Sequence, residues 1–179
     1  MTLYAGFQSS VAYPQVAYQG DFYGLPINNG GKGYIVDPAS AGINIGTFCW
    51  GLIGTNNTQV TPFKGSNTEI AGFTVRSQSG VWSDSDIIKG YSMTVPATRQ
   101  IQVFANGSFY AICPSLNSGD VIVAGDIVLL NNTTGALASQ TTSVVPSGYT
   151  QVAGYIVINA SPTNSTITNL VVISNRISF

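Results

Sequence analysis

The segment that decides the fold is Gln100-Ile101-Gln102-Val103-Phe104-Ala105-Asn106-Gly107-Ser108-Phe109-Tyr110-Ala111-Ile112, in the middle of a 179-residue chain. Two runs rich in Val, Ile, Phe and Tyr, 100–105 and 109–112, flank the Asn106-Gly107 pair. Asn-Gly is favoured in two-residue hairpin turns because both residues tolerate positive φ. The pattern therefore predicts a β-hairpin in which the two runs are antiparallel neighbours.

Further runs of the same kind alternate with glycine-containing turns along most of the chain. The other candidate strands are 34–36, 47–53, 70–75, 121–123, 127–130, 149–159 and 167–174. Short strands with turns about every 8–12 residues are typical of sandwiches and barrels, not of alternating strands and helices. We predict an all-β fold, an antiparallel β-sandwich or jelly-roll-like barrel, in which 149–159 and 167–174 form a second hairpin. The best helical candidate is a short turn around 83–89.

Residues 1–20 differ from the rest because their aromatic residues show no strand-like alternation. These aromatics are Tyr4, Phe7, Tyr13 and Tyr18. We predict an extended N-terminal arm over 1–20, anchored by aromatic side chains on another surface, and a single β domain over 21–179. The alternative is that the same aromatics pack on the core of their own domain.

The scarcity of charge excludes several classes of function. Only 7% of the residues are charged, against roughly 25% in a usual globular protein. The chain has no histidine, so imidazole catalysis and histidine-ligated metals are excluded. A formal net charge of -1 gives no cationic surface for nucleic acid, and no run of apolar residues is long enough for a membrane-spanning helix.

No motif supports catalysis or a cofactor. The sequence Gly30-Gly31-Lys32-Gly33 resembles a phosphate-binding loop but lacks the Ser or Thr that must follow the lysine, so we expect a turn. Asp84 and Asp86 lack the further oxygen ligands of a calcium loop. Asp120 and Asp126 each follow a glycine, where aspartate favours turns. We therefore expect no catalytic, cofactor-binding or metal-binding residue, and no enzyme.

The tryptophans and cysteines have predominantly structural interpretations. Trp50 lies in an apolar run and is expected in the core, whereas Trp82 lies in a polar stretch and is expected at the surface. Exposed aromatics of this kind could also line a glycan-binding face. Cys49 and Cys113 are expected to be buried free thiols of a chain made in a reducing cytosol, since the N-terminus lacks the pattern of a secretory signal.

Several segments, taken in order, resemble the structural cement (capsid decoration) proteins of tailed bacteriophages. The resemblance extends over about residues 10–140 and departs from the family pattern at Ala97, Ser108 and Tyr110. The matching segments are Ala17-Tyr18-Gln19-Gly20-Asp21-Phe22, Ile45-Gly46-Thr47-Phe48-Cys49-Trp50, Ala71-Gly72-Phe73-Thr74-Val75-Arg76, Gly90-Tyr91-Ser92-Met93-Thr94-Val95-Pro96, Val103-Phe104-Ala105-Asn106-Gly107-Ser108-Phe109-Tyr110, and Gly125-Asp126-Ile127-Val128 followed by Thr134-Gly135.

The resemblance implies a virion structural protein, made in the host bacterial cytoplasm, that binds the capsid exterior. It would cement neighbouring major capsid proteins as a dimer or trimer, without nucleic acid, membrane or cofactor. The residues expected at the capsid or oligomer interface are Tyr4, Phe7, Tyr13, Tyr18 and Trp82. Two alternatives remain open: a glycan-binding or receptor-binding β-module of a phage fibre or tail, and a subunit that assembles into arrays by itself.

Overall fold

The computed structural model describes residues 19–23, 31–54, 58–75, 94–160 and 169–175. These residues form strands and connecting loops, and no helix among them could span a membrane. The all-β prediction is confirmed. The predicted arm residues 1–18 and the helical turn around 83–89 lie outside the described part of the chain.

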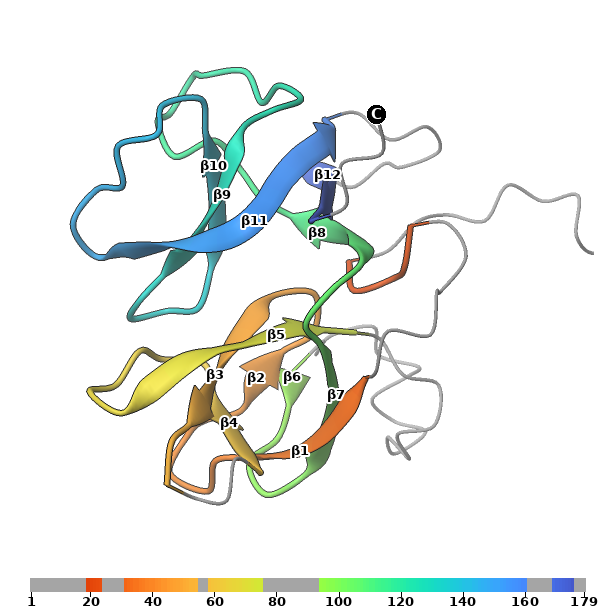
Figure 1. The fold of residues 1–179 in the computed structure, drawn as a ribbon, viewed down its shortest axis with the longest axis vertical. Helices are drawn as coiled ribbons and strands as arrows, with labels where there is room; N and C mark the ends of the chain where they lie inside the picture. Colours follow the sequence, from red (N-terminus) through yellow and green to blue (C-terminus); the bar gives the residue numbers. More distant parts are fainter. Residues whose placement is uncertain (1–18, 24–30, 55–57, 76–93, 161–168, 176–179) are drawn as a thin grey trace, which may run out of the picture.

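The strands group into two lobes, shown one above the other in Figure 1. In chain order the strands are β1 (Lys32–Val36), β2 (Ile43–Asn44), β3 (Phe48–Leu52), β4 (Gln59–Thr61), β5 (Thr68–Thr74), β6 (Thr94–Val95), β7 (Gln100–Phe104), β8 (Ser108–Ile112), β9 (Ile127–Asn131), β10 (Leu137–Gln140), β11 (Tyr149–Asn159) and β12 (Leu170–Ser174). The lower lobe holds β1 to β7 and the upper lobe holds β8 to β12.

The lower lobe is a closed barrel with strand order β1-β4-β3-β5-β7. Its strands pair antiparallel except β1 and β4, which are parallel. β2 and β6 form a separate two-stranded sheet. Alternate residues point into a barrel, and the interior here is filled mainly by Val and Ile side chains. The buried cluster comprises Tyr34, Val36, Ile43, Ile45, Cys49, Val60, Val95, Ile101 and Val103.

The upper lobe is a five-stranded antiparallel sheet with the order β10-β9-β11-β12-β8. β11 has the bounds predicted from the sequence, and it pairs antiparallel with β12, with Ile156 opposite Ser174. The predicted second hairpin is therefore confirmed. The two strands lie inside the sheet, flanked by β9 and β8, and are not an addition at its edge.

The hairpin predicted at Asn106-Gly107 is wrong. β7 belongs to the barrel and β8 to the upper sheet, where its partner is β12. Gly107 has a φ of 150°, and a Cβ there would lie 2.6 Å from Cζ of Phe109. The glycine is thus needed for a crossover between lobes, because Phe109 turns into the space between them.

Two other local expectations also fail. Residues 121–123 form a loop and no strand, although all three are β-branched; Val121 and Val123 are exposed and Ile122 is half-buried. Lys32 and Gly33, expected in a turn, open β1. In both cases the pairing partner, or the lack of one, overrides local propensity.

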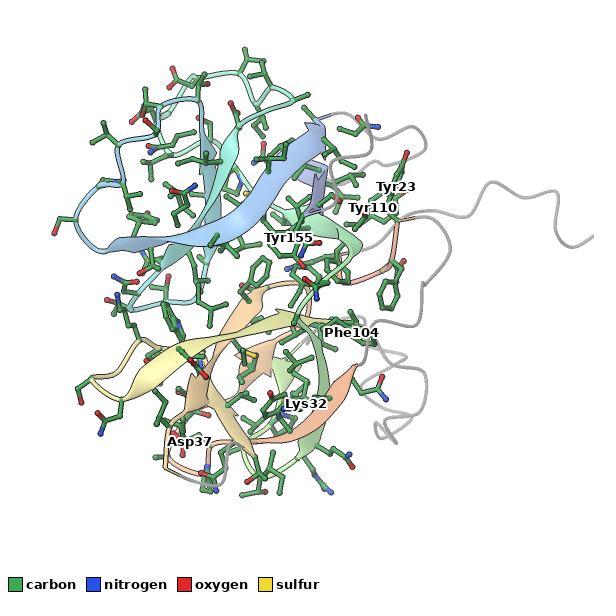
Figure 2. All side chains as sticks on the ribbon, viewed as in Figure 1. Tyr23, Lys32, Asp37, Phe104, Tyr110 and Tyr155 are labelled. Carbon is green, nitrogen blue, oxygen red and sulfur yellow. The ribbon has the colours of Figure 1, made fainter. Side chains whose placement is uncertain are left out.

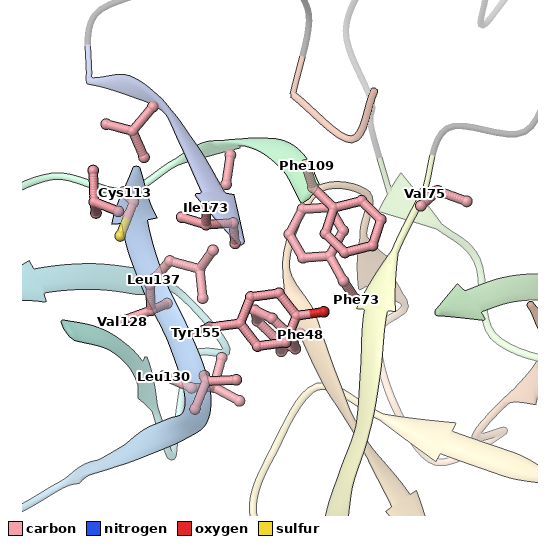
Figure 3. Close-up of a cluster of buried hydrophobic side chains, with 14 of the residues drawn as sticks. Phe48, Phe73, Val75, Phe109, Cys113, Val128, Leu130, Leu137, Tyr155 and Ile173 are labelled. Atoms are coloured by element: carbon pink, nitrogen blue, oxygen red, sulfur yellow. The ribbon is translucent and has the colours of Figure 1, made fainter. Parts of the chain in front are cut away.

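An aromatic core fills the space between the barrel and the sheet. Phe48 and Phe73 from the barrel meet Phe109 and Tyr155 from the sheet in Figure 3. The rings of Phe73 and Phe109 stack with centroids 4.4 Å apart, and Phe48 contacts Tyr155 edge-on at 4.8 Å. Because both lobes supply these side chains, neither can bury its inner face without the other.

β3 and β5 supply both cores because their residues alternate between the two sides. Along β3, Cys49 points into the barrel while Phe48 and Trp50 belong to the aromatic core. Opposite them, the register shifts so that Ala71 of β5 has no direct partner, as in a β-bulge. Bulges re-aim side chains, and this one turns Ala71 to the barrel and Phe73 to the junction.

Candidate interaction surfaces

The described residues hold no group of three or more His, Cys, Asp or Glu side chains that could bind a metal ion. Asp126 is almost completely buried, but hydrogen bonds account for both its carboxylate oxygens. Oδ2 accepts from the backbone N–H of Val123 at 3.0 Å, and Oδ1 accepts from the hydroxyl of Thr141 at 2.8 Å. Asp120 is likewise used in a turn, where it accepts from Asn117 Nδ2 at 2.9 Å. The structural roles predicted for both aspartates are confirmed.

The two thiols are buried and unpaired, as predicted. Burial raises the pKa of Cys113 to about 12 and also raises the pKa of Cys49. Both thiols are therefore neutral at physiological pH and poor nucleophiles.

The five residues predicted at an interface, Tyr4, Phe7, Tyr13, Tyr18 and Trp82, lie outside the described part of the chain. Trp50, predicted in the core, is only 2% exposed, which confirms that prediction. The Lys64 ammonium lies 5.6 Å from the Trp50 ring centroid and donates to Thr150 Oγ1 at 3.1 Å, so it bridges from the barrel to the sheet. Trp50 offers no ring for stacking on a sugar.

Residues 19–23, at the base of the predicted arm, lie along the edge strand β8. Tyr110 of β8 accepts from the Gly20 N–H at 2.8 Å and donates to the Asp21 carbonyl at 2.9 Å, and the Tyr23 N–H donates to Ser108. Covering an edge strand in this way satisfies backbone groups that would otherwise be exposed. The segment thus extends the upper sheet by a short strand-like piece.

Side chains fix this segment at the boundary between the lobes. The ring centroid of Phe22 lies 4.9 Å from that of Phe104 in the barrel and 5.2 Å from that of Phe109 in the sheet. Tyr23 packs against Tyr110 with ring centroids 5.6 Å apart, on the right of the view in Figure 2. Gln19 Nε2 donates to the Gly46 carbonyl at 3.2 Å. Whatever precedes residue 19 therefore starts from a fixed point on the molecule.

Two loops of the upper lobe expose valines that the sequence interpretation missed. Val121 and Val123 lie between β8 and β9, and Val144 and Val145 lie between β10 and β11; all four are exposed. Figure 1 shows the first loop at the top of the upper lobe and the second at its left side. Because of their β-branching, the sequence predicts Val121 and Val123 in a strand, so it does not indicate their exposure.

The barrel also exposes a few large apolar side chains, and it carries five of the eight charged residues of the described chain. Ile35, Ile53 and Phe63 are each more than 40% exposed. The charged residues described in the barrel are Lys32, Asp37, Lys64, Glu69 and Arg99. Figure 2 labels Lys32 and Asp37 on this lower lobe. The upper lobe contains no cationic residue over 108–160 or 169–175.

Comparison with known proteins gives one family and one shared fold. The model of the phage family described as structural cement protein (E217 gp24/Pam3 gp6) matches residues 7–175. The match extends beyond the sequence resemblance of residues 10–140 and includes the β11–β12 region. No curated protein sequence matches the chain.

Among solved structures, the chain is similar to a chain of the capsid of Myoviridae phage XM1. The TM-score is 0.59 at 12% sequence identity, covering 93% of this chain and 96% of the other. At that identity the likeness concerns the fold alone. It extends over both lobes, because the aligned part includes nearly the whole chain.

Proposed function

This chain belongs to the phage structural cement protein family, and from that premise we propose that it binds the outer surface of an assembled capsid and joins neighbouring major capsid proteins. The observation that carries the proposal is the family match over almost the entire chain, 7–175. A cement protein acts by buried contact area repeated over many copies. Weak individual contacts suffice, because simultaneous binding at several sites multiplies their effect.

The finer parts of the proposal concern assembly and location. The protein is made in the host bacterial cytoplasm, acts as a dimer or trimer at the capsid exterior, and binds neither nucleic acid nor membrane. It performs no catalysis and needs no cofactor. Two observations support the absence of catalysis. The thiols are buried and neutral, and both carboxylate oxygens of Asp126 are used in structural hydrogen bonds.

The predicted arm is the part that we propose reaches a neighbouring protein. Tyr4, Phe7, Tyr13 and Tyr18 supply large apolar contacts there, and Trp82 adds a further contact. Aromatic side chains suit this role because they bury a large area with few rotatable bonds. The fixed base of the arm at residues 19–23 supports the proposal, since a firmly held base transmits a pull on the arm to both lobes.

The test is a variant that lacks residues 2–18 but keeps the Gln19–Tyr23 segment. We expect it to fold with an unchanged unfolding midpoint and to lose attachment to capsids that lack the wild-type protein. A second variant, with Tyr4, Phe7, Tyr13 and Tyr18 changed to Ser, separates the aromatic contacts from the length of the arm. If the truncated protein still saturates such capsids, the arm is not the attachment element. If the wild-type protein does not bind them, the proposed function itself is wrong.

A further inference from the structure

Charge divides the described chain into two unequal parts. Residues 108–160 and 169–175, which form the upper lobe, contain only two charged residues, Asp120 and Asp126. Asp126 is 2% exposed and fully hydrogen-bonded, so Asp120 is the only exposed charged side chain over 108–160 and 169–175. It lies next to Val121 and accepts a hydrogen bond from Asn117 Nδ2, and the half-buried Asp21 lies on the segment along β8. The barrel presents charges of both signs, among them Lys32, Glu69 and Arg99, which are all exposed.

The upper lobe also carries the most exposed large apolar side chains of the described residues. We call the segments 117–125 and 141–148 the valine loops. Val121 is 79% exposed and Val144 is 75% exposed, whereas the most exposed apolar side chain of the barrel, Ile53, is 54% exposed. Exposed apolar side chains on a surface with few charges are typical of protein interfaces.

The valine loops are fixed in place from within the upper lobe. The Asp126 carboxylate joins them, because it accepts from Val123 of one loop and from Thr141 of the other. Gln140 donates from Nε2 to the carbonyls of Thr142 and Val144, at 3.0 and 2.6 Å. Ile122 packs against the aromatic core and anchors the first loop. A surface that is ordered before binding loses less conformational entropy when a partner covers it.

We propose that the valine loops are a docking surface for the major capsid protein and that the charged barrel faces solvent. The inference rests on the proposed function, because a cement protein must present one surface to the shell. Charge depletion favours the upper lobe for that surface, since a charge buried at an interface without a partner is costly. The partner surface is correspondingly neutral and apolar, and the exposed charges of the barrel keep the outer side of the attached protein hydrated.

The proposed contact predicts that capsid binding is insensitive to salt. Without cationic side chains at the loops, capsid binding does not weaken when NaCl rises from about 0.1 to about 1 M, although the Debye length falls from about 10 to about 3 Å. A contact made through Lys32, Lys64 and Arg99 of the barrel would weaken over the same range. A marked loss of capsid binding at high salt would therefore contradict the proposal.

The decisive experiment compares charge insertion in the two lobes on capsids that lack the protein. Val121→Asp and Val144→Asp place a charge in the valine loops, and Ile53→Asp places the same charge on an exposed aliphatic residue of the barrel. We expect each loop variant to raise the apparent Kd by about tenfold or more, as for a central contact residue. Ile53→Asp is expected to stay within about twofold, as for a residue outside the contact.

Two controls complete the test. Val121→Lys and Val144→Lys should weaken binding as the Asp variants do, because burial of either charge is unfavourable; loss with Asp alone would indicate repulsion from Asp120 and contradict the proposal. Unfolding midpoints confirm that the variants fold. If the wild-type protein binds and the loop variants bind equally well, this inference is wrong while the proposed function stands. If the loop variants dissociate an oligomer in solution but bind capsids normally, the loops contact a second copy instead.

Discussion

The barrel interior and the junction between barrel and sheet are built from different side chains. Seven of the nine buried residues in the barrel cluster are Val or Ile, whereas the junction contains Phe48, Trp50, Phe73, Phe109 and Tyr155. β-branched residues fit the narrow interior of a small barrel, and large rings fill the wider gap between packed sheets. The barrel thus encloses a core of its own, whereas the aromatic side chains of its β3 and β5 and the inner face of the upper sheet each need the other lobe for burial.

The two lobes also differ in the charge and hydrophobicity of their surfaces. The barrel carries five of the eight described charged residues, including every described cation, and the upper lobe carries exposed valines and a single exposed aspartate, Asp120. For a capsid-binding structural protein, this difference separates a part suited to water from a part suited to contact. The shared aromatic core packs the two parts against each other.

The largest effect is expected from removing a ring that both lobes share. Phe109→Ala should lower the free energy of unfolding by roughly 3–5 kcal/mol, because Phe109 is fully buried and stacks on Phe73. Ile43→Ala, which touches the barrel cluster only, should cost roughly 2–5 kcal/mol. Urea unfolding followed by Trp fluorescence and by circular dichroism measures both variants.

The form of these unfolding curves tests whether residues 21–179 are a single domain, which we propose. Both substitutions should then shift one common transition, seen identically by the two probes. Two separate transitions, with Ile43→Ala affecting only one of them, would show that the barrel unfolds independently of the sheet.

A smaller effect is expected at the crossover between the lobes. Gly107→Ala should cost about 3 kcal/mol, because the new Cβ meets the positive φ and the buried Phe109 ring together. The matched control is Gly119→Ala in a valine loop, where φ is 95° but no atom lies within 4 Å of the added Cβ. It should cost about 1 kcal/mol, from backbone strain alone. Equal losses for the two variants would mean that the approach of Phe109 contributes nothing.

The smallest effect is expected from the thiols, which should not react in the native protein near neutral pH. Cys49 lies in the barrel cluster and Cys113 in the shared core, and burial raises the pKa of both above the value of 9.0 for a free thiol. The neutral thiols therefore contribute fully to stability below about pH 9 and lose this contribution as the pH rises toward about 12.

Alkylation of the two thiols, followed by mass spectrometry, provides the measurement. We expect no labelling at pH 8 without denaturant, and labelling of both thiols together as the protein unfolds. Labelling of Cys49 well before Cys113 would show that the barrel opens while the junction stays packed. An unfolding midpoint that rises between pH 9 and pH 11 would contradict the sign of the pKa effect.

Local sequence patterns predicted individual strands well where strand propensity and pairing with a neighbouring strand agree. The run 149–159 became β11 with the same bounds, and 127–130 became β9 with one residue added. Residues 137–140 were missed because Ala138, Ser139 and Gln140 have little strand preference, and pairing with β9 makes them a strand. Residues 121–123 have the preference but lack a partner strand.

The interaction surface was less predictable than the strands. The aromatic arm residues stay a prediction from composition, because they lie outside the described part of the chain. The valine loops were not predicted, because exposure depends on which loops the core leaves uncovered. The carboxylate that joins these loops, Asp126, was recognised as a turn residue. Its second partner, Thr141, lies 15 residues away in the chain, and no local pattern indicates that contact.

The sequence by itself determined the all-β class, the absence of histidine chemistry, the low charge and most strand positions, because these depend on residue type and short-range periodicity. Only the tertiary structure decided that Asn106-Gly107 is a crossover. The partner of β8 is β12, about 60 residues further along the chain, and Phe109 gains more by entering the shared aromatic core than a local hairpin would offer. Pairing between distant strands and burial between lobes are properties of the whole chain, and local turn preference is too weak to oppose them.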